Sequence, residues 1–167
     1  MSEHAVRRVH PGPSQESVWD YPRPPRVEPT FERVVVELGG VALVDTTQAV
    51  RVLETSHPPV YCLLRSDFPD AALRPAEGTS YCEFKGSARY LDVVVGNARS
   101  PRAAWFYPDP APAFESLRDR VAVYPAAMDR CRVDEEIVQA QDGGFYGGWI
   151  TSRVVGPFKG SPGTRGW

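Results

Sequence analysis

The clearest pattern along the chain is a pair of apolar, valine-rich runs that meet at two glycines. ERVVVEL (32–38) is followed by Gly39 and Gly40, and VALVD (41–45) comes directly after them. Valine favours strands, and a Gly-Gly pair adopts the positive backbone angles that a tight hairpin turn requires. The pattern therefore predicts an antiparallel hairpin over 32–45.

Further short apolar runs follow, and proline or glycine ends each of them. PPVYCLLR (58–65) is typical of a buried strand, and RAAWFYPDPAP (102–112) of a strand that proline terminates. SYCEF (80–84) and SARYLDVVV (87–95) flank Lys85-Gly86. These two runs predict a second tight hairpin.

Helix signals are weaker and occur at two places. Asp45-Thr-Thr-Gln48 resembles a capping box, which predicts one or two helical turns up to Leu53. AFESLRDRVAVY places Phe114, Leu117 and Val121 on one helical face, which predicts a helix over 113–121. The fold class is thus mainly β: a small domain of short antiparallel strands and hairpins with one or two short helices, as a curled sheet or two packed sheets.

Composition divides the chain into three parts. Residues 1–30 hold six of the 17 prolines and predict an extended N-terminal arm, in which Trp19 and Tyr21 dock on a surface. Residues 31–136 form the β-rich core domain. Residues 137–167 form a Gly/aromatic C-terminal tail, whose last 25 residues contain eight of the 14 glycines. We leave open whether the tail wraps onto the domain, covers a pocket, reaches a neighbouring subunit or is loosely ordered.

Net charge and cysteine content limit the classes of partner, ligand and location that we expect for the chain. The formal charge is −2 and the pI about 5.9, whereas nucleic acids and anionic membranes require a concentrated basic face, so we expect neither as a partner. No apolar run of about 18 residues and no apolar signal core occurs, so we expect a cytoplasmic protein. Cys62, Cys82 and Cys131 form no CxxC pair. They predict free thiols rather than a disulfide framework, and neither metal nor cofactor is expected.

Strand alternation predicts a polar, aromatic face. In SYCEFK the residues Tyr81, Glu83 and Lys85 share one side, with Cys82 and Phe84 on the other. Tyr90 and Asp92 oppose the apolar Leu91, Val93 and Val95, and Trp105 lies with Tyr107. Aromatic walls with a few charged groups are typical of small-molecule pockets. The tyrosines with Trp105 are therefore a candidate wall, and the margin of a core is the alternative.

RVLETSHPPVY (51–61) supplies the candidate chemistry. His57 titrates near neutral pH, Glu54 could orient it or act as a base, and Arg51 or Lys85 could bind an anionic group. In the structural alternative, Arg51 and Glu54 form a surface pair, Ser56 caps a turn and His57 bonds to backbone. A catalytic pair of Cys82 as nucleophile and His57 as its base is a further alternative. Strand alternation disfavours this pair, because it predicts that the Cys82 side chain points inward, on the same side as Phe84.

Three segments in order, RVLETSHPPVY, TSYCEFKGSARY and AAWFYPDP, resemble the bacterial domain-of-unknown-function family numbered 427, over about residues 31–136. The resemblance implies a β-tent-like domain, related to zinc-ribbon-like domains but without their CxxC knuckles. The following motif positions carry over: Arg51, Glu54, His57, Tyr61, Cys82, Lys85, Gly86, Tyr90, Trp105 and Tyr107. A nucleotidyltransferase-like label is used for this family. The sequence contains neither an Asp-x-Asp pair nor a Gly-rich phosphate loop for such chemistry.

Two hypotheses of function follow. The first is a small-molecule-binding β-domain, with enzyme activity on an anionic or aromatic metabolite left open. Its acid–base candidates are Glu54, His57 and Lys85, and its ligand-binding candidates are Arg51, Tyr61, Tyr81, Cys82, Tyr90, Trp105 and Tyr107. It requires Glu54, His57, Lys85, Tyr90 and Trp105 to converge around one cavity. The second is a non-catalytic interaction module that associates with itself, for example as a homodimer, through the arm and the tail.

Overall fold

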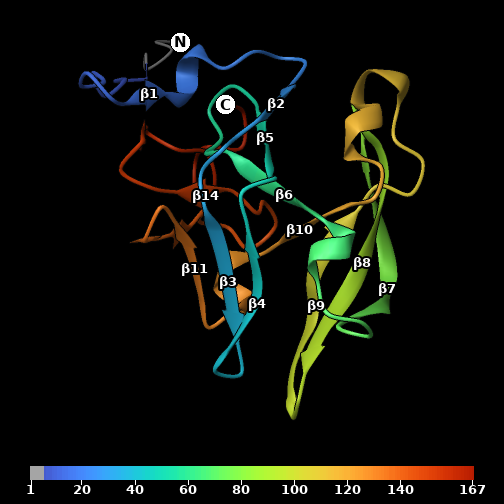
Figure 1. Ribbon diagram of the computed structural model, residues 1–167. Helices are drawn as coiled ribbons and strands as arrows, with labels where there is room; N and C mark the ends of the chain where they lie inside the picture. Colours follow the sequence, from blue (N-terminus) through green and yellow to red (C-terminus); the bar gives the residue numbers. More distant parts are fainter. Residues whose placement is uncertain (1–5) are drawn as a thin grey trace.

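The computed structural model describes residues 6–167, so the first five residues of the predicted arm lie outside the described part. Its largest unit is a seven-stranded antiparallel sheet in the order β2-β5-β6-β10-β9-β8-β7 (Figure 1). The strands of this sheet are β2 (Arg26–Pro29), β5 (Val50–Leu53), β6 (Val60–Leu64), β7 (Leu73–Cys82), β8 (Gly86–Val95), β9 (Ala98–Phe106) and β10 (Arg120–Val123).

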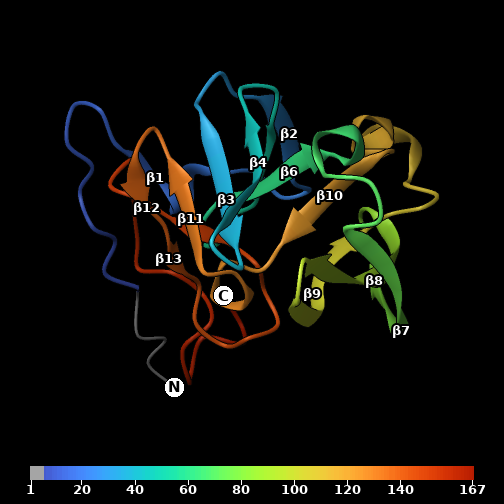
Figure 2. The same ribbon diagram turned by 60° about the horizontal axis from the view of Figure 1, so that its bottom comes forward.

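A second sheet has four antiparallel strands in the order β12-β11-β3-β4. They are β3 (Val34–Leu38), β4 (Val41–Thr46), β11 (Arg130–Val133) and β12 (Glu136–Ile137). Figure 2 shows β3, β4 and β11 side by side, with β6 and β10 running from them towards the long strands β7–β9. The two sheets therefore form two layers.

Short elements complete the chain. Two small strand pairs are the parallel β1 (Glu16–Ser17) with β15 (Val154–Val155) and the antiparallel β13 (Gln139–Ala140) with β14 (Trp149–Ile150). Four 3₁₀ helices are η1 (Val18–Asp20), η2 (Arg65–Asp67), η3 (Pro112–Leu117) and η4 (Pro125–Ala127). Within residues 6–167 no helix is both long and apolar enough to cross a membrane.

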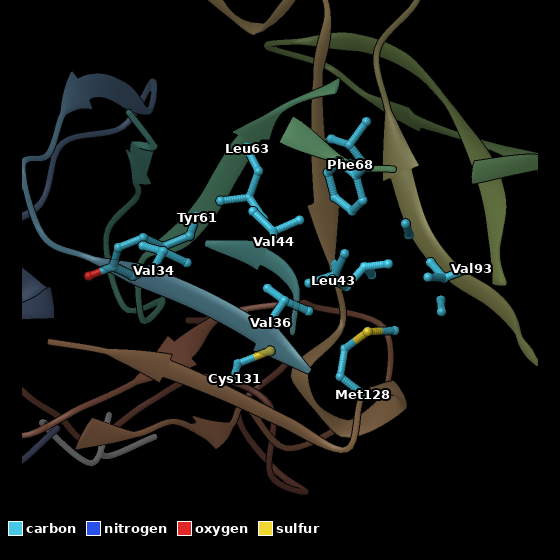
Figure 3. Close-up of a cluster of buried hydrophobic side chains, with 14 of the residues drawn as sticks. Val34, Val36, Leu43, Val44, Tyr61, Leu63, Phe68, Val93, Met128 and Cys131 are labelled. Carbon is cyan, nitrogen blue, oxygen red and sulfur yellow. The ribbon is translucent and has the colours of Figure 1, made fainter. Parts of the chain in front are cut away.

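The main core lies between the two sheets (Figure 3). Val34 and Val36 of β3 and Val44 of β4 meet Leu63 of β6 and Val121 of β10, and all five are buried. These side chains alternate with polar or opposite-facing neighbours along their strands, as the period of two requires. One face of the large sheet is therefore occupied by the core.

A second apolar cluster lies on the other face of the large sheet. Val50, Cys62 and Ala122 contribute from the strands, and Phe114 and Leu117 of η3 cover them. This face holds the cavity described below.

The predicted mainly β, antiparallel architecture is confirmed. Both hairpins form: β3 with β4, and β7 with β8, although the second turn covers Glu83–Lys85 rather than Lys85-Gly86 alone. The prediction of helical turns from Asp45 to Leu53 is wrong, because β5 begins at Val50 and pairs with both β2 and β6. Sheet pairing thus overrides a local capping signal.

The predicted helix over 113–121 is present only in its first part. The segment is the 3₁₀ helix η3 as far as Leu117, and Asp119 then takes a positive φ of 62° that ends any helix. Strand β10 follows, and Val121 lies in it between β6 and β9. The apolar spacing that suggested a helix comes from Phe114 and Leu117 on one face of the sheet and Val121 on the other.

The predicted boundaries of the arm and tail do not coincide with edges of the fold. Strand β2, within 1–30, is an edge strand of the large sheet. Strand β1 pairs with β15, and Trp19 donates its indole N–H to the carbonyl of Pro157 at 2.8 Å. Trp149, in the predicted tail, is fully buried in the main core. Both terminal segments are therefore built into the domain.

Candidate functional site

A cavity of about 270 Å³ lies on the face of the large sheet that carries the second apolar cluster. Glu54 and His57 reach it from the turn between β5 and β6, and Lys85 from the turn between β7 and β8. Tyr90 of β8 and Trp105 of β9 form part of its wall. The five side chains that the sequence predicted would converge thus line one cavity.

Cross-strand pairing explains which side chains face this cavity. Directly opposed residues in an antiparallel sheet share a face. One such row crosses five strands through Val50, Cys62, Ala122, Trp105 and Tyr90. The cavity wall is therefore set by the register of β5, β6, β10, β9 and β8.

The turn between β5 and β6 is held on two sides. Ser56 has a φ of 72° and is fully buried, its N–H bonds to the carbonyl of Val18, and its carbonyl accepts the N–H of Lys159. The N–H of His57 closes the turn on the carbonyl of Glu54 at 3.0 Å. Both terminal segments therefore fix the position from which His57 enters the cavity.

His57 makes three side-chain contacts. Its Nδ1 lies 3.2 Å from Nε2 of Gln141, its Nε2 lies 3.5 Å from Oε2 of Glu54, and its ring meets that of Tyr146 edge-on at 4.9 Å. Glu54 is also 3.2 Å from the guanidinium of Arg23. The imidazole is therefore oriented by an amide and an aromatic ring, with a carboxylate nearby.

Burial lowers the pKa of His57 from 6.5 to about 4, and the nearby charges of Lys159, Arg23 and Lys85 act in the same direction. Protonation of a buried imidazole among cations is unfavourable, because the charged ring is desolvated and is repelled by the neighbouring positive charges. His57 is consequently neutral at pH 7.

Two lysines border the cavity, and they are the only lysines of a chain that has seventeen arginines. The ammonium of Lys85 lies 5.8 Å from the ring centre of Tyr107, and that of Lys159 lies 5.4 Å from the ring centre of Tyr146. Lysine is a compact point charge, whereas arginine is a fixed fork. Both lysines of the chain therefore supply compact positive charges at the cavity.

The aromatic wall is continued by the C-terminal segment. The rings of Trp105 and Tyr124 are 4.5 Å apart, and the hydroxyl of Tyr124 donates to the carbonyl of Phe145. A Cβ added at Gly147 would stand 2.1 Å from the Trp105 ring. Only glycine allows the backbone to approach the indole this closely, which explains why a glycine is required at this position of the C-terminal segment.

Two of the three free thiols border the cavity. Burial raises the pKa of Cys62 to about 12, so this thiol stays protonated. Cys82 is half-buried and faces the cavity, since its cross-strand partner Gly86 and the neighbouring pair Ser80–Ala88 continue the row of Tyr90. Cys82 thus shares a side with Phe84, as alternation predicted, and this side borders the cavity rather than the main core.

The same register corrects the position of Tyr81. Strand alternation places its side chain on the face opposite to Tyr90, and Tyr81 is 76% exposed, touching only the cavity rim. The predicted face was inverted because the turn over Glu83–Lys85 interrupts the alternation assumed along SYCEFK.

Arg51 and Tyr61 lie away from the cavity, so their predicted ligand contacts do not match this geometry. Both side chains are on the main-core face, directly opposite each other across β5 and β6. The guanidinium of Arg51 is fully buried and bonds to Glu16 and Glu28. The hydroxyl of Tyr61 donates to Glu32 at 2.9 Å, and its ring packs on Trp149. Arg51 alternates with Val50 and Val52, which do face the cavity side.

Eight of the ten predicted site residues thus border the cavity, and their functional roles stay predictions. The lining residues that sequence reasoning missed include Tyr124, Gln141, Tyr146 and Lys159. The scarcity of lysine was a usable signal for Lys159. Nothing in the local sequence pattern marks Gln141 as a residue of the cavity. Among residues 6–167, no three His, Cys, Asp or Glu side chains are grouped so that they could hold a metal ion.

The fold and the site together define a small, mainly β domain with a polar, aromatic cavity. Residues 26–134 match the family model described as a domain of unknown function, DUF427, and the chain belongs to this family. No curated protein matches the chain. Gln141, Tyr146 and Lys159 lie beyond the matched residues, so the cavity is completed by a segment outside the family domain.

Proposed function

We propose that the chain binds a small molecule in this cavity, an aromatic or anionic metabolite. The observation that carries the proposal is the arrival of Glu54, His57, Lys85, Tyr90 and Trp105 from four separate elements at one cavity. Its volume, about 270 Å³, is close to the lower end of the range of about 300–1,000 Å³ that is usual for ligand sites. Aromatic walls with a few convergent polar groups are the typical composition of such sites.

The polar groups also support proton transfer on a bound ligand. Glu54 is the candidate base, because its carboxylate is held by Arg23 beside the cavity. The neutral His57 is the candidate hydrogen-bond donor, and Lys85 is the candidate cation. Whether the ligand reacts is decided by turnover assays and not by binding alone.

The proposal is tested by thermal denaturation in the presence of nucleotides, sugar phosphates and aromatic acids. A ligand that binds only the folded state raises the melting temperature by mass action. Trp105→Leu removes part of the aromatic wall, so we expect it to abolish the shift. Phe31→Leu changes an aromatic residue that is 89% exposed and is the matched control, which should retain the shift. The proposal fails if no compound raises the melting temperature, or if Trp105→Leu retains the full shift.

Self-association through the terminal segments is the alternative function. In the structure both segments contact the chain's own domain, through β1 with β15 and β13 with β14. Light scattering of the full chain over a range of concentrations separates the two hypotheses. A mass that stays that of one 18.5 kDa chain contradicts self-association.

We propose a cytoplasmic location as well. The support is chemical: Cys62, Cys82 and Cys131 are free thiols, and free thiols persist where the surroundings are reducing. Cell fractionation with a tagged chain tests this, and recovery of the protein from a secreted fraction would contradict it.

A further inference from the structure

The side-chain amide of Gln141 has a fixed orientation. Its Nε2 donates to the carbonyl of Lys159 at 2.7 Å, and its Oε1 accepts the N–H of Gly148 at 3.1 Å. The reversed orientation would place an acceptor against the Lys159 carbonyl and a donor against the Gly148 N–H. The second N–H of Nε2 is therefore the donor in the 3.2 Å contact with Nδ1 of His57.

It follows that His57 accepts at Nδ1 and carries its proton on Nε2, because a neutral imidazole has one donor and one acceptor. Nε2 is 3.5 Å from the carboxylate of Glu54, beyond the range of about 2.7–3.2 Å of a normal N–H···O bond. That carboxylate already has Arg23 as a partner. The Nε2–H group thus retains capacity to donate to a ligand in the cavity.

Lys85 and Lys159 provide two further donors. Within residues 6–167 neither ammonium forms an ion pair with an Asp or Glu side chain, and Lys159 contacts the main-chain oxygen of Trp167, the last described residue, at 3.4 Å. Cations beside apolar walls that lack a side-chain carboxylate partner favour a bound anion. Of the two carboxylates that also line the cavity, Glu54 is paired with Arg23 and Glu83 is exposed to solvent. The charged side chains around His57 are Glu54, Arg23, Lys85 and Lys159, of which three are cationic.

Building on the proposed small-molecule site, we propose that its ligand carries a carboxylate or phosphate group, bound by Nε2–H of His57 and the ammonium groups of Lys85 and Lys159, and a planar part that packs on Trp105. Gln141 is the positioning residue, because it presents the donor nitrogen of His57 to the anion. Lys159 and Gln141 lie outside the residues matched by the family, so the C-terminal segment completes the anion site.

The ligand class is tested with three small probes of similar shape. Benzoate and phenyl phosphate carry the two anionic groups, and benzamide is the neutral, planar control. Chemical-shift titration at low ionic strength measures the three affinities in the full chain. We expect at least one of the two anions to bind about tenfold or more tightly than benzamide, and their order distinguishes carboxylate from phosphate.

Lys85→Met and Lys159→Met should each remove most of this preference and leave benzamide binding unchanged. Arg89→Met is the matched control, because Arg89 is an exposed cation outside the cavity, next to Tyr90 in the chain. Equal binding of benzoate, phenyl phosphate and benzamide overturns the anion site and leaves the small-molecule site standing. If none of the three binds, both proposals fail. An anion preference that survives both lysine variants also overturns the inference.

The role of Gln141 is tested without any ligand. Long-range ¹⁵N–¹H correlation at neutral pH distinguishes protonated from unprotonated imidazole nitrogens, and the spectrum of His57→Asn assigns the His57 signals. We expect Nδ1 to be unprotonated and Nε2 protonated. Gln141→Glu should reverse this, because a carboxylate can only accept from Nδ1–H. The opposite tautomer in the unaltered chain overturns the proposed donor role, whether or not the variant folds.

Discussion

The strand pair β5–β6 carries polar groups on both faces, and the two groups differ in how fully they are paired. On the core face, Arg51 bonds to Glu16 and Glu28, and Tyr61 bonds to Glu32. On the cavity side, Lys85 and Lys159, which come from other segments, have no Asp or Glu partner within the described chain, and the nearest carboxylate to His57 is at 3.5 Å. Paired polar groups stabilise a fold, whereas donors left available beside a cavity can bind a ligand.

This difference explains why one motif contains both kinds of residue. RVLETSHPPVY spans Arg51, which ties β2 and the N-terminal segment to β5, and His57, which enters the cavity. The two side chains are six positions apart in sequence and lie on opposite faces of the large sheet. Variants on each face should therefore separate stability from ligand binding.

The largest effect is expected at Arg51. Arg51→Met leaves the carboxylates of Glu16 and Glu28 without their buried partner, so the free energy of unfolding should fall by about 3–4 kcal/mol. Both carboxylates are about one third exposed, which keeps the cost at the lower end. Urea denaturation measures the change. Arg26→Met, at an exposed residue paired with Glu28, is the control and should cost under about 0.5 kcal/mol. Equal stability of the two variants would contradict a structural role for Arg51.

The next effect concerns the pH dependence of stability at His57. Its pKa in the folded chain, about 4, is below the ordinary value of 6.5, so the unfolded chain takes the proton first. The stability that the neutral imidazole provides is complete above pH 6.5 and is lost as the pH falls from 6.5 to about 4.

His57→Gln should abolish this part of the acid sensitivity, about 3 kcal/mol at full extent for a shift of this size. Urea denaturation of both proteins between pH 7 and pH 4 measures the difference, in which the carboxylates titrate equally and cancel. Parallel stability curves for the two proteins would show that His57 is not buried in its neutral form.

A smaller effect is expected at Tyr61. Tyr61→Phe removes the hydroxyl that donates to Glu32 and keeps the ring on Trp149, so the unfolding free energy should fall by about 1 kcal/mol. Tyr107→Phe, on the cavity side, is the matched variant for ligand titrations. A loss of ligand binding in Tyr61→Phe with stability unchanged would reverse our assignment of the two faces.

The smallest effect on stability is expected at Lys85. Because no carboxylate in the described chain pairs with its ammonium, Lys85→Met should change the unfolding free energy by no more than about 0.5 kcal/mol. Denaturation at neutral pH measures this. A large loss of stability would show that Lys85 stabilises the fold, as the paired groups of the core face do, and would contradict the difference between the two faces.

Sequence signals were reliable for structural features formed by residues that are close together in the chain. The hairpin of β3 and β4 follows from valine-rich runs around Gly39-Gly40, and both glycines do take positive φ angles. Alternation correctly grouped Tyr90, Trp105 and Tyr107, because β8 and β9 pair without interruption at Tyr90 and Trp105. It wrongly grouped Tyr81 with Lys85, since the turn over Glu83–Lys85 breaks the period between them.

Non-local pairing explains the remaining errors. Helix signals at Asp45 and near Phe114 were overridden because β5 and β10 each pair with two neighbouring strands. Propensity and capping contribute little compared with two sets of sheet hydrogen bonds and a buried face. The burial of Arg51 depended on Glu16 and Glu28, which are 35 and 23 positions away in the chain.

The sequence by itself determined the mainly β class, the family and the two hairpins. These depend on residue periodicity, on turn residues and on motifs that are read along one segment at a time. Only the tertiary structure decided that Arg51 and Tyr61 face the core and that Gln141 and Lys159 reach His57 from the C-terminal segment. The reason is physical: which face of a sheet is buried, and which distant segment covers it, depends on contacts that no local pattern encodes.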